Sequence, residues 1–181
     1  QMGLEMLGAV GEAQVQQAVR LAAQSLAQLG AAWVLEVSHM GYLFGLFDAL
    51  SVPENARPGL LEKLREKNAH ELRRAAQAAG LDAAGAAALT GLLELSGSYA
   101  ATLSKAAALC RNPAMTAAVA ELTALAPTLG QAGGSIRLDL TLAGEMEYYN
   151  GLVFQGYLKA LPRPLLKGGR YDLLMQKFTP G

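Results

Sequence analysis

The sequence predicts an α+β fold: an antiparallel sheet flanked by helices and interrupted by a helical insertion. Alternating apolar residues occur near both ends of the 181-residue chain, at 1–7 and 135–158, as expected for strands. The stretch between them shows helical apolar spacing and helix caps. An apolar fraction of 52% is ample for a core.

The first fifty residues predict alternating strands and helices. The pattern over 1–7 has the period of a strand, and residues 10–29 have helical spacing. Residues 32–38 alternate again and predict a second strand. Ser38 is expected to cap a short helix that runs to Leu50.

The middle of the chain predicts a packed helical insertion. Residues 54–126 hold about four short, Ala-rich helices and no chemical motif. Ser51 and Glu54 have capping-box spacing, and Asp82 and Asn112 are expected to cap later helices.

The last third predicts two strands and a helix. Residues 135–142 and 148–158 alternate, and a link as short as 143–147 requires them to be antiparallel. The glycines at 168–169 predict a tight turn before a helix at 170–178.

These elements divide the chain into three segments. Residues 1–53 and 131–181 are expected to form the two parts of a sheet domain, and 54–130 the insertion. The chain begins with Gln1 and ends just after a structured stretch, so we expect it to be truncated at both ends.

Composition argues against several classes of protein. Fifteen basic residues balance fifteen acidic ones, which disfavours a broad nucleic-acid footprint. No apolar run reaches the ~18 residues of a membrane helix, and no signal peptide is visible. Cys110 is the single cysteine, so no internal disulfide suggests secretion. His39 and His70 lack acidic or thiol partners at ligand spacing, so no metal or other cofactor is predicted. We expect a cytoplasmic protein.

Polar residues on the first strand form one candidate site. Gln1 and Glu5 lie on one side of this strand, ~13 Å apart, and Gly3 leaves a gap between them. This arrangement suits the floor of a pocket for a small ligand with an ammonium or imidazole group. A solvent-facing sheet surface explains the same pattern equally well.

Two later clusters extend the candidate site. Tyr148 and Tyr149 face opposite sides of their strand, so one can pack while the other lines a cleft; tyrosine is also a common strand former. Backbone N–H groups beside the glycines at 168–169 favour an anion, and Arg170 could bind a carboxylate or phosphate. Arg170 could equally pair with Asp172.

Three segments resemble the histidyl-tRNA synthetase family. Residues 147–154, Glu-Tyr-Tyr-Asn-Gly-Leu-Val-Phe, resemble its Asp-Tyr-Tyr-Thr-Gly-x-x-Phe signature. Residues 168–174 resemble the Gly-Gly-Arg-Tyr-Asp-x-Leu segment that follows it. Residues 1–8 look like the Gln-x-Gly-x-Glu-x-x-Gly strand that closes the second class II motif. The resemblance covers essentially the whole chain and implies the class II synthetase fold.

The resemblance also implies a pocket for free histidine. Gln1 and Glu5 would hold the amino acid from the sheet floor, and Tyr149 and Tyr171 would contact its polar groups. Supporting positions would be Gly3, Gly151, Gly168, Gly169 and Arg170.

One departure from the family bears on catalysis. A charging synthetase has an arginine five positions before the second tyrosine of the pair, where this chain has Gly144. A cation beside developing negative charge is often the largest catalytic contribution, and glycine cannot supply it. The family's threonine after the tyrosine pair is Asn150 here.

This departure favours a non-catalytic relative. The run at 149–157 looks closer to the regulatory subunits of ATP phosphoribosyltransferase, which are synthetase paralogues in histidine biosynthesis. That resemblance implies histidine and the short-form catalytic subunit as partners, a homodimer within a hetero-oligomer, and neither nucleic acid nor membrane. Two alternatives are an authentic histidyl-tRNA synthetase with a displaced arginine and a binding module without a histidine site.

Overall fold

The computed structural model describes residues 2–142 and 149–172. In chain order its elements are α1 (Glu12–Ala27), β1 (Trp33–His39), α2 (Met40–Ala49), η1 (Glu54–Ala56), α3 (Arg57–Arg65), α4 (Ala69–Ala78), α5 (Ala83–Thr90), η2 (Gly91–Glu94), β2 (Ser96–Ser98), α6 (Tyr99–Ala108), α7 (Pro113–Gly130), β3 (Ser135–Asp139), β4 (Leu152–Leu158) and β5 (Leu166–Gly169).

The strands form one sheet in the order β2-β3-β1-β4-β5. Neighbours are antiparallel except for β1 and β3, which are parallel. The predicted α+β class is confirmed, and β3 and β4 do run in opposite directions. They are not adjacent, however, because β1 lies between them. The apolar side chains of Leu35 and Val37 are fully buried, which suits a central strand.

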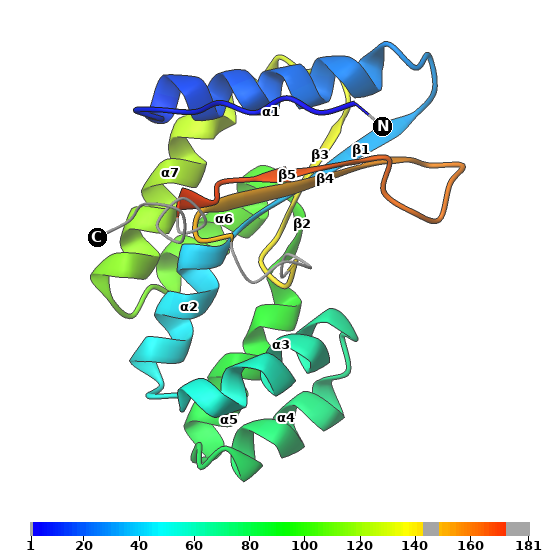
Figure 1. Ribbon diagram of the computed structural model, residues 1–181. Helices are drawn as coiled ribbons and strands as arrows, with labels where there is room; N and C mark the ends of the chain where they lie inside the picture. Colours follow the sequence, from blue (N-terminus) through cyan, green and yellow to red (C-terminus); the bar gives the residue numbers. More distant parts are fainter. Residues whose placement is uncertain (1, 143–148, 173–181) are drawn as a thin grey trace.

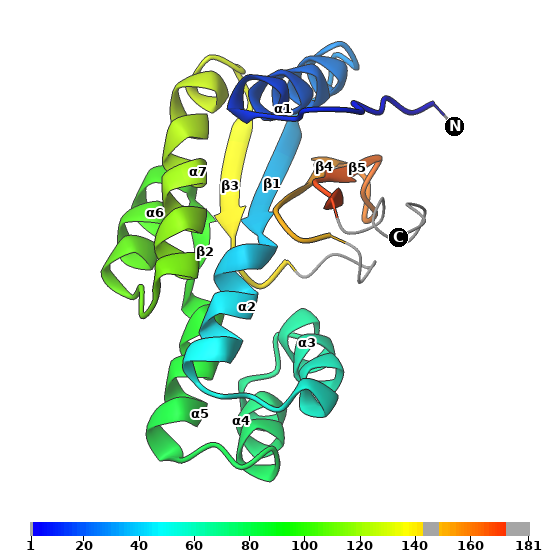
Figure 2. The same ribbon diagram turned by 60° about the vertical axis from the view of Figure 1, so that its left-hand side comes forward.

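The two faces of the sheet differ in character. On one face α1 packs closely against β4, where a Cβ added to Gly156 would lie 2.6 Å from Leu26. The other face, which we call the polar face, carries a row of side chains in register across four strands: Arg137, Glu36, Gln155 and Lys167. Figures 1 and 2 show α3, α4 and α5 grouped below the sheet.

The helices α3, α4 and α5 pack mainly on one another. They bury Leu60, Leu64, Leu72 and Leu89 completely or nearly so. In contrast, α6 packs on β3, and α7 packs on α1, α2 and α6. The division of the chain at 54 and 130 stays a prediction.

Several predicted caps are confirmed and two are wrong. Asp82 and Asn112 accept hydrogen bonds from backbone N–H groups three residues ahead. The cap of α2 is His39, one residue after the predicted serine. Ser51 caps nothing, because the chain there turns through a left-handed conformation (φ 53°) and α3 begins later, at Arg57.

The strand predicted at the beginning of the chain is absent from the described residues 2–7. These residues form none of the backbone hydrogen bonds found between residues 2–142 and 149–172, and Met2 is 99% exposed. An alternating pattern makes a strand only where a neighbouring strand is available. Residues 168–169 belong to β5 instead of a tight turn, and nearly all of the helix predicted at 170–178 lies outside the described residues.

Among the described residues, none of the helices has both the length and the apolar composition that crossing a lipid bilayer requires.

Candidate ligand site

The start of β4 and the end of β5 bring two tyrosines together. Tyr149 and Tyr171 are 22 positions apart by number, yet their rings meet edge to face, with centroids 6.4 Å apart and an interplanar angle of 64°. The backbone aligns these segments, since Asn150 N–H donates to the Arg170 carbonyl at 3.1 Å. The Arg170 N–H in turn donates to the Leu152 carbonyl at 2.8 Å. The sheet thus places two phenol groups at one edge, where they can offer hydrogen bonds to a small polar ligand.

The glycines at 168–169 allow aromatic rings to lie directly on β5. A Cβ on Gly168 would lie 2.4 Å from the Phe154 ring, and one on Gly169 would lie 2.7 Å from the Tyr149 ring. The expected close approach is present, but neither glycine has a positive φ. Glycine in a strand interior usually weakens the strand, and it often marks a place where another group approaches closely. Here the groups that approach are the rings of Phe154 and Tyr149.

Arg170 pairs with its neighbour in the sequence. Its Nε donates to Asp172 Oδ2 at 2.7 Å, which is the intramolecular alternative considered from the sequence. The side chain lies against Gly151, where an added Cβ would be 3.1 Å from Arg170 Cδ. Asn150 Oδ1 accepts from Asp172 N–H at 3.2 Å and closes this corner.

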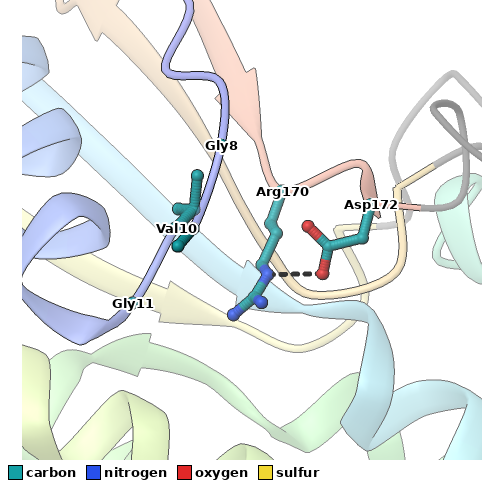
Figure 3. Close-up of a pocket in the computed structure, with 6 residues that line it drawn as sticks. Gly8, Val10, Gly11, Arg170 and Asp172 are labelled. Atoms are coloured by element: carbon teal, nitrogen blue, oxygen red, sulfur yellow. Dashed lines mark hydrogen bonds and ion pairs between the residues drawn. The ribbon is translucent and has the colours of Figure 1, made fainter.

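A shallow cavity of about 550 Å³ lies beside this ion pair. It is lined by residues 8–11, Arg170 and Asp172. Figure 3 shows the guanidinium group directed at the space beside Val10 and Gly11, with the Asp172 carboxylate on its other side. A carboxylate or phosphate placed here would compete with Asp172 for the guanidinium group.

The structure gathers the later members of the candidate site and leaves the earliest ones apart. Tyr149, Tyr171 and the supporting residues at 151 and 168–170 form one corner of the sheet. Glu5 is exposed and forms no hydrogen bond or ion pair with a described residue. No described atom lies within 4 Å of a Cβ added to Gly3, and Gln1 and Gly144 lie outside the described residues.

Sequence reasoning missed a pair next to this corner, between a buried imidazole and an exposed carboxylate. His39 Nε2 lies 3.1 Å from Glu121 Oε2 on α7, and His39 Nδ1 accepts the Gly41 N–H at 3.1 Å. The hydrogen bond from His39, together with the nearby charge of Arg170, holds the pKa of Glu121 below its ordinary value. No local pattern could have found the pair, because 82 positions separate its members.

A second missed cluster lies on the polar face. Lys67, which follows α3, donates to the buried Asp139 carboxylate at 2.6 Å. Burial, and then the charge of Asp139, raise the pKa of Glu36, while Lys67 and Arg137 oppose that rise. Glu36 itself forms a loose ion pair, with its Oε1 3.9 Å from Arg137 Nε.

Replacing Glu36 with glutamine is expected to raise stability at pH 7 slightly, by up to about 0.5 kcal/mol for a half-buried group. A carboxyl whose pKa is raised by folding destabilises the folded state when ionised, and the penalty disappears as the pH falls through its folded pKa. Urea unfolding at pH 7 and at pH 4 measures this: the advantage of Glu36→Gln should vanish at the lower pH. A variant less stable than wild type at pH 7 would show that the Arg137 pair outweighs the desolvation.

Residues 2–142 and 149–172 contain no group of three or more His, Cys, Asp or Glu side chains arranged to hold a metal ion.

The whole chain, residues 1–181, matches the sequence profile of the family described as Histidyl-tRNA synthetase. The chain belongs to this family. The sheet corner with its tyrosine pair and glycines contains the described parts of the two segments, 147–154 and 168–174, that resemble signatures of the family.

Relatives with curated names are similar over nearly the entire chain. ATP phosphoribosyltransferase regulatory subunits from Halalkalibacterium halodurans and Moorella thermoacetica are each 33% identical over 98% of this chain. The chain spans about half the length of these relatives, 45% and 46%.

Solved structures share the fold. A protein from Bacillus halodurans C, described as an ATP phosphoribosyltransferase regulatory subunit/histidyl-tRNA synthetase, matches with a TM-score of 0.83 and 32% identity over 94% of this chain and 46% of that one. The ATP phosphoribosyl transferase (HisG:HisZ) complex from Thermotoga maritima matches with a TM-score of 0.71 and 19% identity, over 90% of this chain and 57% of that chain. At that identity the likeness concerns the fold alone.

Proposed function

We propose that this chain is part of a regulatory subunit of ATP phosphoribosyltransferase, and that the whole protein binds the short catalytic subunit in the cytoplasm and responds to histidine. Its role in the complex is regulatory, and the chemistry belongs to the partner. The chain would contribute the histidine pocket, with Tyr149 and Tyr171 on one side and Gln1 and Glu5 on the other. The assembly would contain a homodimer of this subunit within a hetero-oligomer, without nucleic acid or a membrane.

The observation that carries the proposal is the glycine at position 144 in a chain that keeps most residues of the family's signatures. Removing a cation from the point where negative charge develops leaves binding possible and slows the chemistry. The names of the similar relatives support the same function. Regulation additionally requires histidine to bind one state of the complex better than another.

The test is a titration of histidine into the complete protein mixed with its catalytic partner. Phosphoribosyl transfer by the partner should depend on the regulatory subunit and change as histidine is added. Activity that is the same with and without the subunit, at every histidine concentration, would exclude this function.

An authentic histidyl-tRNA synthetase is the second candidate, because the matching family profile carries that description. Histidine-dependent ATP–pyrophosphate exchange distinguishes the two, since exchange requires histidyl-adenylate to form. Robust exchange by the complete protein would refute the regulatory proposal. A third candidate, a binding module without a histidine site, would be favoured if calorimetry detected no histidine binding.

Replacing Glu5 with alanine is expected to weaken histidine binding by ~1.5–3 kcal/mol, the usual size of a hydrogen bond to a charged group. The reason is that its carboxylate would meet the ligand cation within the pocket. Calorimetry on the complete protein measures the effect, with Glu54→Ala, which removes an exposed carboxylate from η1, as the control. Equal affinities for wild type and Glu5→Ala would place Glu5 outside the site.

A further inference from the structure

The carboxylate of Asp139 joins three parts of the chain. Its Oδ2 accepts from Lys67 Nζ at 2.6 Å. Its Oδ1 accepts from both the N–H and the hydroxyl of Thr141, at 2.9 and 2.6 Å. One buried side chain, 3% exposed, therefore ties the end of β3 both to Lys67, which follows α3, and to Thr141 in the turn after β3.

The backbone at Lys67 is strained in a way that serves this contact. Lys67 follows α3 in a left-handed conformation (φ 52°), where glycine is usual after a helix. A side chain with a Cβ adopts this conformation at a cost. The position nevertheless holds a lysine, and its long side chain spans the distance from α3 to the sheet.

Asp139 and the tyrosine pair share the polar face. Arg137, Glu36, Gln155 and Lys167 are paired in register on that face. Residues two positions along a strand lie on the same face, so Asp139 and Gly169 do too. The Tyr149 ring lies against Gly169 on the side where a Cβ would project, which is the polar face. Asp139 lies on the same face, three strands away on β3.

The contacts of Asp139 favour the ionised form of its carboxyl group. Burial raises the pKa of Asp139, but the hydrogen bonds from Lys67 and Thr141 outweigh burial, and the pKa lies below its ordinary value. The carboxylate is therefore ionised at neutral pH. Losing Lys67 would leave a buried charge without its counter-ion, and the local structure would have to rearrange.

We propose that Lys67 and Asp139 are positioning residues of the ligand site, which fasten the end of α3 to the polar face of the sheet and hold the turn at 139–141. This inference rests on the proposed function only for the identity of the ligand, histidine. The ion pair fixes the β3 end of the polar face, and the Tyr149 ring lies against β5 on the same face.

The test compares Lys67→Met with Lys63→Met in the complete protein. Lys63 is the matched control, because it lies in the last turn of α3, four positions before Lys67, and pairs with an acid, Glu66, at the surface. Hydrogen exchange should accelerate at the Thr141 amide and in α3 in Lys67→Met only. The Kd for histidine should rise about 2- to 30-fold in Lys67→Met, the range for mutations acting through a contact network.

Two further variants separate positioning from general stability. Lys67→Arg restores a cation and should return both the exchange rate and the affinity towards wild type. Lys67→Gly relieves the left-handed strain without restoring the ion pair, so Thr141 should still exchange rapidly even where the melting temperature rises.

Unchanged exchange at Thr141 in Lys67→Met would overturn the inference whether or not histidine binds, as would rescue by Lys67→Gly. If the wild-type protein binds histidine, a Kd in Lys67→Met equal to that of wild type would overturn it as well. Failure of the wild-type protein to bind histidine would instead count against the proposed function, and the exchange experiment would still decide the role of the ion pair.

Discussion

Replacing Gly169 with alanine should lower the stability of the protein by about 1–3 kcal/mol, the usual cost of overpacking, and should disrupt histidine binding. The added Cβ would lie 2.7 Å from two carbons of the Tyr149 ring and 2.8 Å from the Leu152 carbonyl oxygen. That oxygen cannot easily retreat, because it accepts the Arg170 N–H at 2.8 Å. The tyrosine ring must therefore move, and it is a proposed ligand contact.

Chemical denaturation and calorimetry with histidine measure the two effects of Gly169→Ala. The matched control is Gly59→Ala in α3, where an added Cβ has no described atom within 4 Å. Alanine in a helix interior is expected to stabilise by roughly 0.5–1 kcal/mol relative to glycine, so the two substitutions should have opposite signs. Wild-type stability and affinity in Gly169→Ala would show that the Tyr149 ring is not held against β5.

Replacing His39 with alanine should cost about 2–4 kcal/mol, from the loss of a helix cap and of a hydrogen bond to a charged group. His39 is 5% exposed, and both ring nitrogens are used. Because Nδ1 accepts the Gly41 N–H, the proton sits on Nε2 and is donated to Glu121. The adjacent Met40 N–H donates to the Gly151 carbonyl at 2.9 Å, so loosening the start of α2 should also loosen the sheet corner.

Two milder variants separate the two contributions to the loss of stability in His39→Ala, the helix cap and the hydrogen bond to Glu121. His39→Asn keeps an acceptor for the Gly41 N–H, since asparagine is a favourable N-cap, and loses only the contact to α7. Glu121→Gln keeps an acceptor for His39 without the charge. Thermal unfolding should rank the loss of stability as His39→Ala above His39→Asn, and equal losses in both would refute the capping role.

The Glu121 pair should also have a pH signature. A carboxyl whose pKa is lowered by folding stabilises the protein above its ordinary pKa of 4.5, and this stability is lost as the pH falls through the folded pKa. The stability difference between wild type and Glu121→Gln should therefore be full at pH 7 and shrink below about pH 4.5. A difference that persists undiminished into acid would indicate that the charge of Glu121 is not involved.

Local sequence patterns determined which segments are helices and strands wherever the cause is local. Helical spacing and Gly30 predicted α1 and its end, and the side chains of Asp82 and Asn112 cap α5 and α7 as expected. Such features depend on hydrogen bonds within a few residues, which a sequence displays directly. The resemblance to the family singled out Tyr149 and Tyr171, whose rings meet in the structure, while their contact with a ligand stays a prediction.

Only the tertiary structure decided how these segments are arranged. Three features all depend on distant neighbours: the insertion of β1 between β3 and β4, the lack of a strand at residues 2–7, and the choice of His39 over Ser38 as the cap of α2. The ion pair of Lys67 with Asp139 spans 72 positions of the chain. A charged side chain in a sequence gives no sign of its partner, because pairing depends on burial and on distances that exist only after the sheet and the helices have packed together.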